Sequence, residues 1–256
     1  MSRCLIGYTG FVGQTLLKQT TFDSLFNSKN ISDIKGKNFD LIVCAGASAV
    51  KWKANQNPEE DLRNINSLIE NLKEVETKKF ILISTVDVYK NPILVDEDTV
   101  IEPGEIDPYG RHRFYLEQFA REHCKDTLTI RLPGLFGTGL KKNFIYDLLN
   151  NNCLHLTHYE SAFQFYNLKN LWKDIQIALE NNLEIVNFAT EPVTAKEVAL
   201  NCFGVDFSNV TEKPSVYYDM RSKFSNLFGE DLNYMCSKQH VLEQIKQFVA
   251  EQKRVE

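Results

Sequence analysis

The sequence lacks the features that mark membrane proteins and nucleic-acid-binding proteins. No apolar run approaches the length needed to cross a bilayer, and residues 1–7 carry no charged leader or cleavage pattern. The formal net charge is −5 with acidic and basic residues interspersed, so no basic face for a phosphate backbone and no polybasic run for a membrane surface stands out. We therefore expect a cytoplasmic protein whose partner is a small molecule, with neither nucleic acid nor membrane bound.

Cysteine is sparse, and its spacing favours buried reduced thiols over a disulfide or zinc framework. The six cysteines show no CxxC pattern, and Cys4 and Cys44 lie inside apolar runs. We expect these thiols in the core. His155 and His158 have no carboxylate or cysteine at ligand spacing, so the sequence predicts no metal site.

Short apolar runs alternate with helical patterns through the first half of the chain. With 43% hydrophobic residues, 256 residues are enough for a sizeable core. Continuous apolar runs that are flanked by turn residues and followed by helices are typical of a parallel sheet buried on both faces. The sequence therefore predicts an α/β fold with a doubly wound parallel sheet. The expected strands lie in residues 2–8, 39–47, 78–85 and 128–136, and the expected helices in residues 11–19, 59–75 and 108–123.

After residue 136 the pattern loosens. Helical patterns cover about residues 143–150, 168–180 and 240–251, and a short strand pattern covers residues 184–190. We expect a main core at residues 1–140 and a smaller lobe at residues 141–256 that is interleaved with the core.

The first expected strand runs into a glycine-rich loop, GYTGFVG, which opens a helix. Glycine permits a tight turn, close approach of backbone to a diphosphate and close helix-to-strand packing, while a helix N-terminus favours negative charge. The motif alone is weak, but this place at the first strand-to-helix junction is that of the dinucleotide fingerprint of a Rossmann fold. An ordinary glycine-rich turn is the alternative. The expected cofactor-binding residues of the loop are Gly7, Thr9, Gly10, Phe11, Val12 and Gly13.

No acidic residue closes the second expected strand, where an acid would bind the adenosine ribose of NAD. The chain offers Asn27, Ser28, Lys29 and Asn30 instead. A carboxylate takes the ribose 2′-hydroxyl and repels a 2′-phosphate, whereas a hydroxyl, an amide and an ammonium group accept that phosphate. The sequence therefore favours NADP, with NAD as the alternative. The stretch up to residue 39 is too short for a further helix and strand, so we expect an abbreviated adenine side.

Five motifs, in order, resemble one family. GYTGFVG, AGA, ISTVDVY, DPYGRHRFYLEQFARE and IRLPGLFGTG together look like the extended short-chain dehydrogenase/reductase family, which contains NAD(P)-dependent sugar-nucleotide epimerases, dehydratases and reductases. The resemblance covers about the first two-thirds of the chain well and the last third faintly. It implies that Thr85, Tyr109 and Arg113 hold the positions of the catalytic Ser or Thr, Tyr and Lys.

The chemistry of that trio follows from the residues themselves. A phenol exchanges protons poorly near neutral pH, so it needs a cation nearby to stabilise phenolate. Position i+4 on a helix places Arg113 on the face of Tyr109. Arginine keeps the charge, but its planar fork is longer and bulkier than an ammonium group and need not reach the nicotinamide ribose in the same way. Thr85 is expected to anchor the substrate oxygen, and His112 to face solvent or the lobe.

The resemblance also implies further contacts. Asn64 is the candidate for the family asparagine, with Asn66 close by and a plain helix position as the alternative. Trp52 follows a strand end, where a packed side chain is favoured over a ligand contact. Lys141 and Arg221 are weaker candidates for binding an anionic group of the substrate. Lys141 is equally well explained as a solvent-exposed residue at the start of a helix. The remaining expected residues are Ala45, Gly46 and Pro133 for the cofactor, and Asp87, Lys142 and Asn143 for the substrate, with a capping or backbone-orienting contact as the alternative for Asp87.

The sequence thus predicts an NAD(P)-dependent oxidoreductase or epimerase that acts on a sugar nucleotide or related polyol. Hydride would pass at the nicotinamide while Tyr109 exchanges a proton. The alternative is a non-catalytic Rossmann protein that binds the dinucleotide as a sensor or structural partner, because the cation has changed from lysine to Arg113. The resemblance allows a homodimer.

Overall fold

The computed structural model describes residues 1–229 and 233–253 and divides into two compact units whose segments alternate along the chain. The first unit comprises Met1–Lys90, Thr99–Leu132 and Leu171–Val186. The second comprises Asn91–Asp98, Pro133–Asn170 and the chain from Asn187 onward.

A six-stranded sheet forms the centre of the first unit, in the order β10-β6-β4-β3-β1-β2. Neighbouring strands pair in parallel from β2 through β6. Side chains such as Ile42, Val43, Ile81 and Leu82 are at most 1% exposed, which explains why these strands read as continuous apolar runs. The expected doubly wound α/β fold is confirmed. The strands are β1 (Arg3–Ile6), β2 (Ser24–Phe26), β3 (Asn38–Cys44), β4 (Glu76–Thr85), β6 (Thr127–Leu132) and β10 (Ile185–Asn187).

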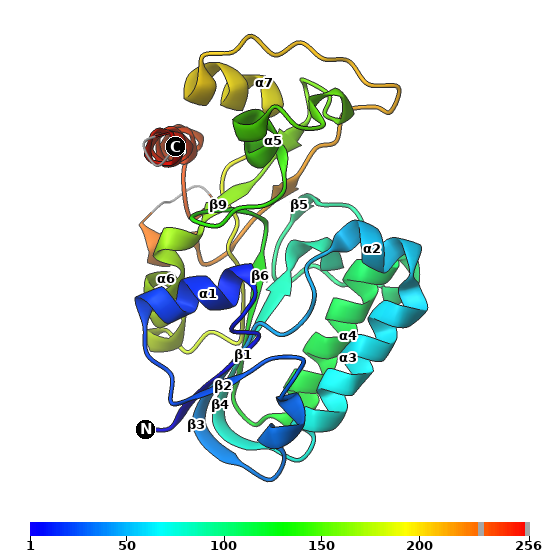
Figure 1. The fold of residues 1–256 in the computed structure, drawn as a ribbon, viewed down its shortest axis with the longest axis vertical. Coiled ribbons are helices and arrows are strands. Elements are labelled where there is room, and N and C mark those ends of the chain that lie inside the picture. Colours follow the sequence, from blue (N-terminus) through cyan, green and yellow to red (C-terminus); the bar gives the residue numbers. More distant parts are fainter. Residues whose placement is uncertain (230–232, 254–256) are drawn as a thin grey trace. The chain divides into compact units, whose positions relative to one another are not determined.

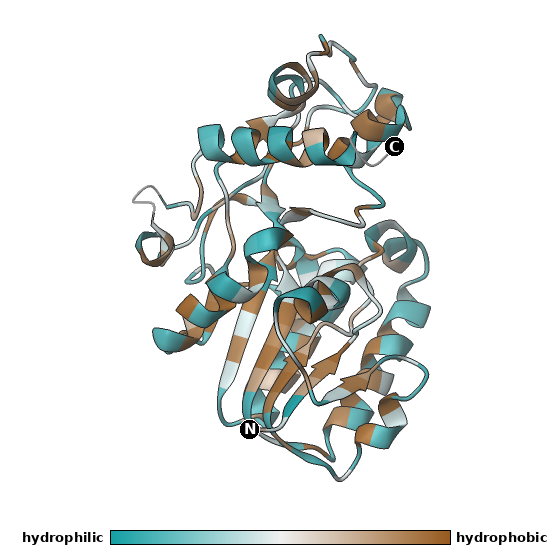
Figure 2. Cartoon of the chain, turned by 60° about the vertical axis from the view of Figure 1, so that its left-hand side comes forward, coloured by the Kyte–Doolittle hydropathy of each residue, from teal (hydrophilic) through white to brown (hydrophobic). Residues whose placement is uncertain are grey.

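Helices cover both faces of this sheet (Figure 1). α1 (Phe11–Gln19) and α6 (Leu171–Glu180) lie on one face, and α3 (Pro58–Leu72) and α4 (Pro108–His123) on the other. Figure 2 shows the apolar strands between helices whose outer sides are hydrophilic. A short helix, α2 (Lys51–Gln56), follows β3 and precedes α3.

The strand order of the sheet reverses direction at β1. From β1 the chain passes to β2 at the edge and then crosses back to β3 on the other side of β1. Only the single turn η1 (Ile31–Ile34) joins β2 to β3, so the abbreviated stretch expected from the sequence is present. In open α/β sheets, ligands bind where the strand order reverses in this way.

A buried ionic network ties α4 to the sheet. Glu117 accepts from Arg131 through both carboxylate oxygens, at 2.7 and 3.1 Å, and from the Ser84 hydroxyl at 2.5 Å. Arg131 also donates to the phenol oxygen of Tyr89 at 2.7 Å. Because every buried charge has a partner, the network fixes α4 against the ends of β4 and β6 without leaving an uncompensated ion.

The second unit has short paired strands and helices around an aromatic core. Phe136, Phe144, Phe165, Phe207 and Phe248 are each at most 7% exposed and belong to one cluster. The strand pairs are β5 (Ile93–Val95) with β12 (Asp219–Met220), β7 (Gly134–Phe136) with β9 (Phe165–Asn167), and β8 (Ala162–Phe163) with β11 (Val193–Thr194). The helices are α5 (Phe144–Asn150), α7 (Ala195–Val198), which continues into a π turn (Ala199–Phe203), and α8 (Lys238–Gln252).

The cysteines are free thiols, and most are at least partly buried. Burial raises the pKa of the Cys44 thiol to about 11, so it stays protonated at neutral pH. Cys153 is exposed, contrary to the expected core position. Within the described ranges, no cluster of three or more His, Cys, Asp or Glu side chains suits a metal ion. No helix in the same ranges is long and apolar enough to pass through a bilayer.

Candidate active site

Two glycines of the loop after β1 are required by the backbone itself. Gly7 has φ +85°, and a Cβ there would lie 2.2 Å from the carbonyl oxygen of Ala45. A Cβ on Gly13 would lie 2.2 Å from the carbonyl oxygen of Gly7. Any side chain at either position would force the loop away from β3 or from α1, so the loop geometry depends on both glycines.

The third glycine stands at the start of α1, and its surroundings suit a diphosphate. Gly10 is the N-cap and provides no side-chain hydrogen bond, and the first turn of the helix carries no acidic residue. A Cβ on Gly10 would meet only the Gly7 carbonyl oxygen, at 3.4 Å. The backbone N–H groups of Phe11, Val12 and Gly13 therefore begin the helix without a side-chain acceptor at its cap, next to Thr9, which is the arrangement that binds phosphate oxygens.

The turn after β2 adjoins this loop, because the Gly7 N–H donates to the Phe26 carbonyl at 2.7 Å. Asn30 Oδ1 accepts from the Asn27 N–H at 2.8 Å, and Asn27 Oδ1 accepts from the Lys29 N–H at 2.8 Å. The two asparagine side chains thus close the turn, and the exposed side chains of Ser28 and Lys29 remain for a ligand.

Two other expected cofactor contacts lie beside the glycine loop, and two lie elsewhere. Ala45 and Gly46 directly follow β3, and the Ala45 N–H donates to the Ile6 carbonyl at 2.9 Å. Pro133 directly follows β6 in the chain and begins a segment of the second unit. Asn64 is exposed on α3, and the buried face of that helix carries Asp61 instead. The structure therefore does not bring Asn64 to the expected cofactor site.

Tyr109 and Thr85 come together at the carboxyl edge of the sheet. Thr85 ends β4, and Tyr109 lies in the first turn of α4, 6% exposed. The Thr85 hydroxyl lowers the pKa of the Tyr109 phenol and so favours its ionised form. Asn55 of α2 accepts from the Tyr109 backbone N–H at 2.9 Å and so caps the helix end.

The approach of α4 is close because of a glycine. A Cβ on Gly110 would lie 2.0 Å from the carbonyl oxygen of Asp87, in the turn η2 (Val86–Val88) that follows β4. This contact fixes Tyr109 against the end of β4, and Asp87 beside both. The Asp87 Oδ2 atom lies 3.3 Å from the Thr85 hydroxyl.

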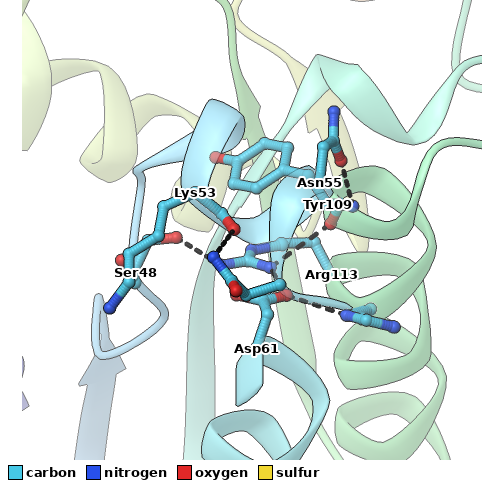
Figure 3. Close-up of polar contacts among 8 residues, drawn as sticks. Ser48, Lys53, Asn55, Asp61, Tyr109 and Arg113 are labelled. Carbon is cyan, nitrogen blue, oxygen red and sulfur yellow. Dashed lines mark hydrogen bonds and ion pairs between the residues drawn. The ribbon is translucent and has the colours of Figure 1, made fainter. Parts of the chain in front are cut away.

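Arg113 lies against the face of the Tyr109 ring. Its guanidinium carbon is 4.2 Å from the ring centroid, within the range of a cation–π contact (Figure 3). The guanidinium donates to the Asp61 carboxylate, to the Ser48 carbonyl, and at 3.4 Å to the Tyr109 carbonyl. The side chain is 3% exposed, so it is fixed by α3 and by the loop after β3.

Asp61 is a member of this group that the sequence-based argument missed. Its Oδ2 atom accepts from Arg113 and lies 2.8 Å from His112 Nδ1. The prediction that His112 faces solvent or the lobe is wrong, because its side chain is buried against α3. A signal was present in the sequence, since Asp61 stands four residues before buried Ile65 on the apolar face of α3.

The electrostatic balance leaves the Tyr109 phenol a weaker acid than free tyrosine. Burial raises the pKa of Tyr109 most strongly, and the charge of Asp87 raises it further. Arg113, the Thr85 hydrogen bond and Lys51 lower the pKa but do not cancel the effect of burial. The phenol of the ligand-free protein is therefore protonated at neutral pH, and it can donate a proton to a bound oxygen atom.

The other expected substrate residues belong to the second unit. Asn143 has φ +99° and caps α5 by accepting from the backbone N–H groups of Ile145 and Tyr146, at 3.0 and 3.2 Å. Its amide is therefore engaged in the helix cap. Lys141 and Lys142 are exposed just before that cap, and Arg221 Nε lies 3.8 Å from the Asp219 carboxylate.

Known structures with similar folds span nearly the whole chain. The dTDP-4-dehydrorhamnose reductase of Clostridium acetobutylicum is 15% identical, with 99% of this chain and 100% of that chain covered and a TM-score of 0.75. The Bacillus anthracis enzyme of the same name, in complex with NADP, is 17% identical over 98% and 99%, with a TM-score of 0.75. The UDP-glucose 4-epimerase of Thermotoga maritima, with UDP-glucose, is 17% identical over 100% of both chains, with a TM-score of 0.68. At these identities the similarity establishes the fold.

A comparison of the sequence with protein-family models identifies the family. No curated protein is similar enough to match the chain. The model of the NAD-dependent epimerase/dehydratase family matches residues 25–156, which is just over half of the chain. The resemblance to extended short-chain dehydrogenases/reductases is confirmed, and the chain belongs to the NAD-dependent epimerase/dehydratase family.

Proposed function

We propose that this chain binds NADP(H) in its first unit and reduces a carbonyl group of a sugar nucleotide. The proposal is supported by the position of Tyr109 in the first turn of α4, at the end of β4 where Thr85 lies, with the Arg113 guanidinium carbon 4.2 Å from its ring centroid. A phenol with a cation against its ring can donate a proton to a bound carbonyl oxygen, because the cation stabilises the phenolate that is left. The structural relatives that are named as reductases or epimerases of nucleotide sugars support the substrate class.

The chain's residues have separate roles in this reaction. A bound NADPH would supply hydride to the carbonyl carbon. The Thr85 hydroxyl holds the carbonyl oxygen, and Tyr109 gives its proton to that oxygen as the alcohol forms. Arg113 packs against the face of the Tyr109 ring and stabilises the Tyr109 phenolate that remains after proton transfer. The N-terminus of α1 and the loop from Gly7 to Gly13 bind the diphosphate.

Non-catalytic dinucleotide binding is the second candidate, and the contacts of Arg113 favour it. Its guanidinium donates to Asp61 and to the Ser48 carbonyl, so those donors are not directed to a nicotinamide ribose. A site built in this way retains the dinucleotide without the cation contact that the family lysine makes. Both candidate functions predict that the chain binds the dinucleotide, but only the reductase predicts that NADPH is consumed.

The test is NADPH consumption with a panel of 4-keto nucleotide sugars that includes dTDP-4-dehydrorhamnose. Loss of NADPH absorbance with one of these sugars, in amounts that match the alcohol formed, is the expected result. The rate should stay level through neutral pH and fall where the phenol ionises, because the protonated form is the donor. NADPH that binds tightly but is not consumed with any member of the panel would favour the sensor.

Replacing Lys29 with glutamate should reverse the preference between the two dinucleotides. Lys29 is exposed in the turn after β2, where we expect its ammonium group to pair with a 2′-phosphate, and a carboxylate there would repel that phosphate. A hydrogen bond to a charged group is worth about 1.5–3 kcal/mol, so NADPH affinity should fall about 10- to 100-fold while NADH affinity holds or rises. Lys18→Glu, in the last turn of α1, is the matched control. Equal losses in both variants would exclude a specific phosphate contact at Lys29.

A further inference from the structure

The helix α2 presents one face to the first turn of α4. Lys51 and Asn55 are four residues apart and so lie on the same side of this helix. Asn55 accepts from the Tyr109 backbone N–H at 2.9 Å, which fixes that side of α2 against the catalytic tyrosine. Lys51 is therefore directed to the same region as the phenol, and its charge acts on Tyr109.

Lys51 forms an ion pair within this region. Its Nζ lies 2.6 Å from Asp87 Oδ1, and the other carboxylate oxygen of Asp87 lies 3.3 Å from the Thr85 hydroxyl. The Thr85 hydroxyl in turn lowers the pKa of the Tyr109 phenol. The contacts thus run from the ammonium group through Asp87 to the Thr85 hydroxyl, and the close packing of Gly110 on the Asp87 carbonyl holds Asp87 against the turn of α4 that carries Tyr109.

Arg113 acts on Tyr109 from a different direction. It lies against the ring face, buried, and its donors go to Asp61, the Ser48 carbonyl and the Tyr109 carbonyl. The Lys51 side chain is 41% exposed, and its pair with Asp87 opens onto solvent. The buried Arg113 guanidinium can support the Tyr109 ring in a fixed position. The half-exposed Lys51–Asp87 ion pair can instead respond when substrate and cofactor bind.

We propose that the Lys51–Asp87 pair, acting through the Thr85 hydroxyl, controls proton donation by Tyr109, with Lys51 supplying the positive charge that in related enzymes comes from the lysine replaced here by Arg113. The inference rests on the proposed function. Lys51 is a positioning residue, since it touches Asp87 and acts on the phenol through it and through the field of its charge.

Before substrate binds, the Thr85 hydroxyl can donate to one of two acceptors, and this is how the pair acts on the phenol. It carries one proton, which it donates either to Asp87 Oδ2 or to a phenolate on Tyr109. When Lys51 neutralises Asp87, the carboxylate competes less well for that proton, and the phenolate is stabilised. The charged groups that face the phenol are Arg113 on its own helix, Asp87 after β4 and Lys51 on α2, with Asp61 behind Arg113.

The test places a ring-fluorinated tyrosine at position 109 and follows its ionisation by fluorine NMR in the full chain. Fluorination makes the phenol a stronger acid and gives a single signal, so the titration needs no substrate. Lys51→Met should raise the pKa of this phenol, because a favourable charge is lost and Asp87 is left unneutralised. Asp87→Asn should lower it, because an unfavourable charge is lost and Thr85 is freed. Lys51→Arg should restore the parental value.

Lys53→Met is the matched control, since Lys53 lies on the same helix and pairs with exposed Glu60. Its titration should equal that of the parent. Shifts of the same sign in Lys51→Met and Asp87→Asn would indicate a structural role for the pair and overturn the proposal, as would no shift in either. Turnover is measured separately: NADPH consumption that survives Tyr109→Phe would overturn the proposed function, whatever the titrations show.

Discussion

Tyr109→Phe is expected to lower the turnover of NADPH about 10²- to 10⁴-fold and to leave NADPH affinity nearly unchanged. General acid catalysis contributes a factor of that size, and the phenylalanine ring keeps the packing while losing the proton. The affinity should hold because the diphosphate contacts come from the loop around Gly10 and the N-terminus of α1, and the phenol takes no part in them. Steady-state rates and a fluorescence titration of the same preparation measure both quantities.

Tyr115→Phe provides the matched control. Tyr115 lies on the same helix, 43% exposed, so loss of its hydroxyl should leave the rate within twofold of the parent, about 0.4 kcal/mol. A Tyr109→Phe variant that turned over as fast as Tyr115→Phe would show that the proton comes from another group.

Asp61→Asn is expected to destabilise the protein by about 3–5 kcal/mol. Asp61 is the carboxylate partner of Arg113, both side chains are at least 93% buried, and removal of one partner leaves an uncompensated charge in the interior. The same carboxylate lies 2.8 Å from His112 Nδ1, so two contacts weaken together. Urea unfolding, with the slope compared between variants, measures the loss.

Two further variants distinguish the loss of the buried Asp61–Arg113 ion pair from the general effect of removing a carboxylate. Glu60→Asn removes a neighbouring carboxylate whose pair with Lys53 is exposed, and it should change stability by less than about 1 kcal/mol. The double variant Asp61→Leu with Arg113→Met removes both charges, and it should be more stable than Asp61→Asn alone. A loss in Asp61→Asn no larger than that in Glu60→Asn would contradict the account of Arg113 as a buried, paired support of the Tyr109 ring.

The fold and the central pair of the site were predictable because both rest on local patterns. Continuous apolar runs predict buried parallel strands, and the glycine loop after the first strand predicts the start of α1. Thr85 at a strand end and Tyr109 at a helix start then meet at the carboxyl edge of the sheet. The i+4 rule likewise placed Arg113 on the face of Tyr109, where the structure has it.

The remaining contacts depend on which helices pack together, and the sequence does not show that directly. Asn55 contacts Tyr109 and Asp61 contacts Arg113 from two other helices, and Lys51 pairs with Asp87 beside them. Trp52, expected to pack, is 65% exposed because α2 directs Lys51 and Asn55 inward.

In the turn after β2, side chains that the sequence predicts as ligand contacts instead accept hydrogen bonds from backbone N–H groups. Asn27 and Asn30 were expected to contact the adenosine phosphate, together with Ser28 and Lys29. Asparagine readily hydrogen-bonds nearby backbone groups in turns, and both asparagines do so here. The proposed phosphate contact is accordingly narrowed to Ser28 and Lys29.

A side-by-side fluorescence titration of the protein and its Gly10→Ala variant with NADPH and NADH tests the central claim most directly. We propose that the glycine loop at the carboxyl ends of β1 and β3 binds a dinucleotide. A Cβ on Gly10 meets only the Gly7 carbonyl oxygen, at 3.4 Å, so the variant should fold, and any loss of affinity reports on the ligand. The account predicts saturable binding with NADPH preferred and clear weakening in Gly10→Ala. Absence of binding by either dinucleotide to the parent protein would contradict it, and the proton-donor role of Tyr109 would fall with it.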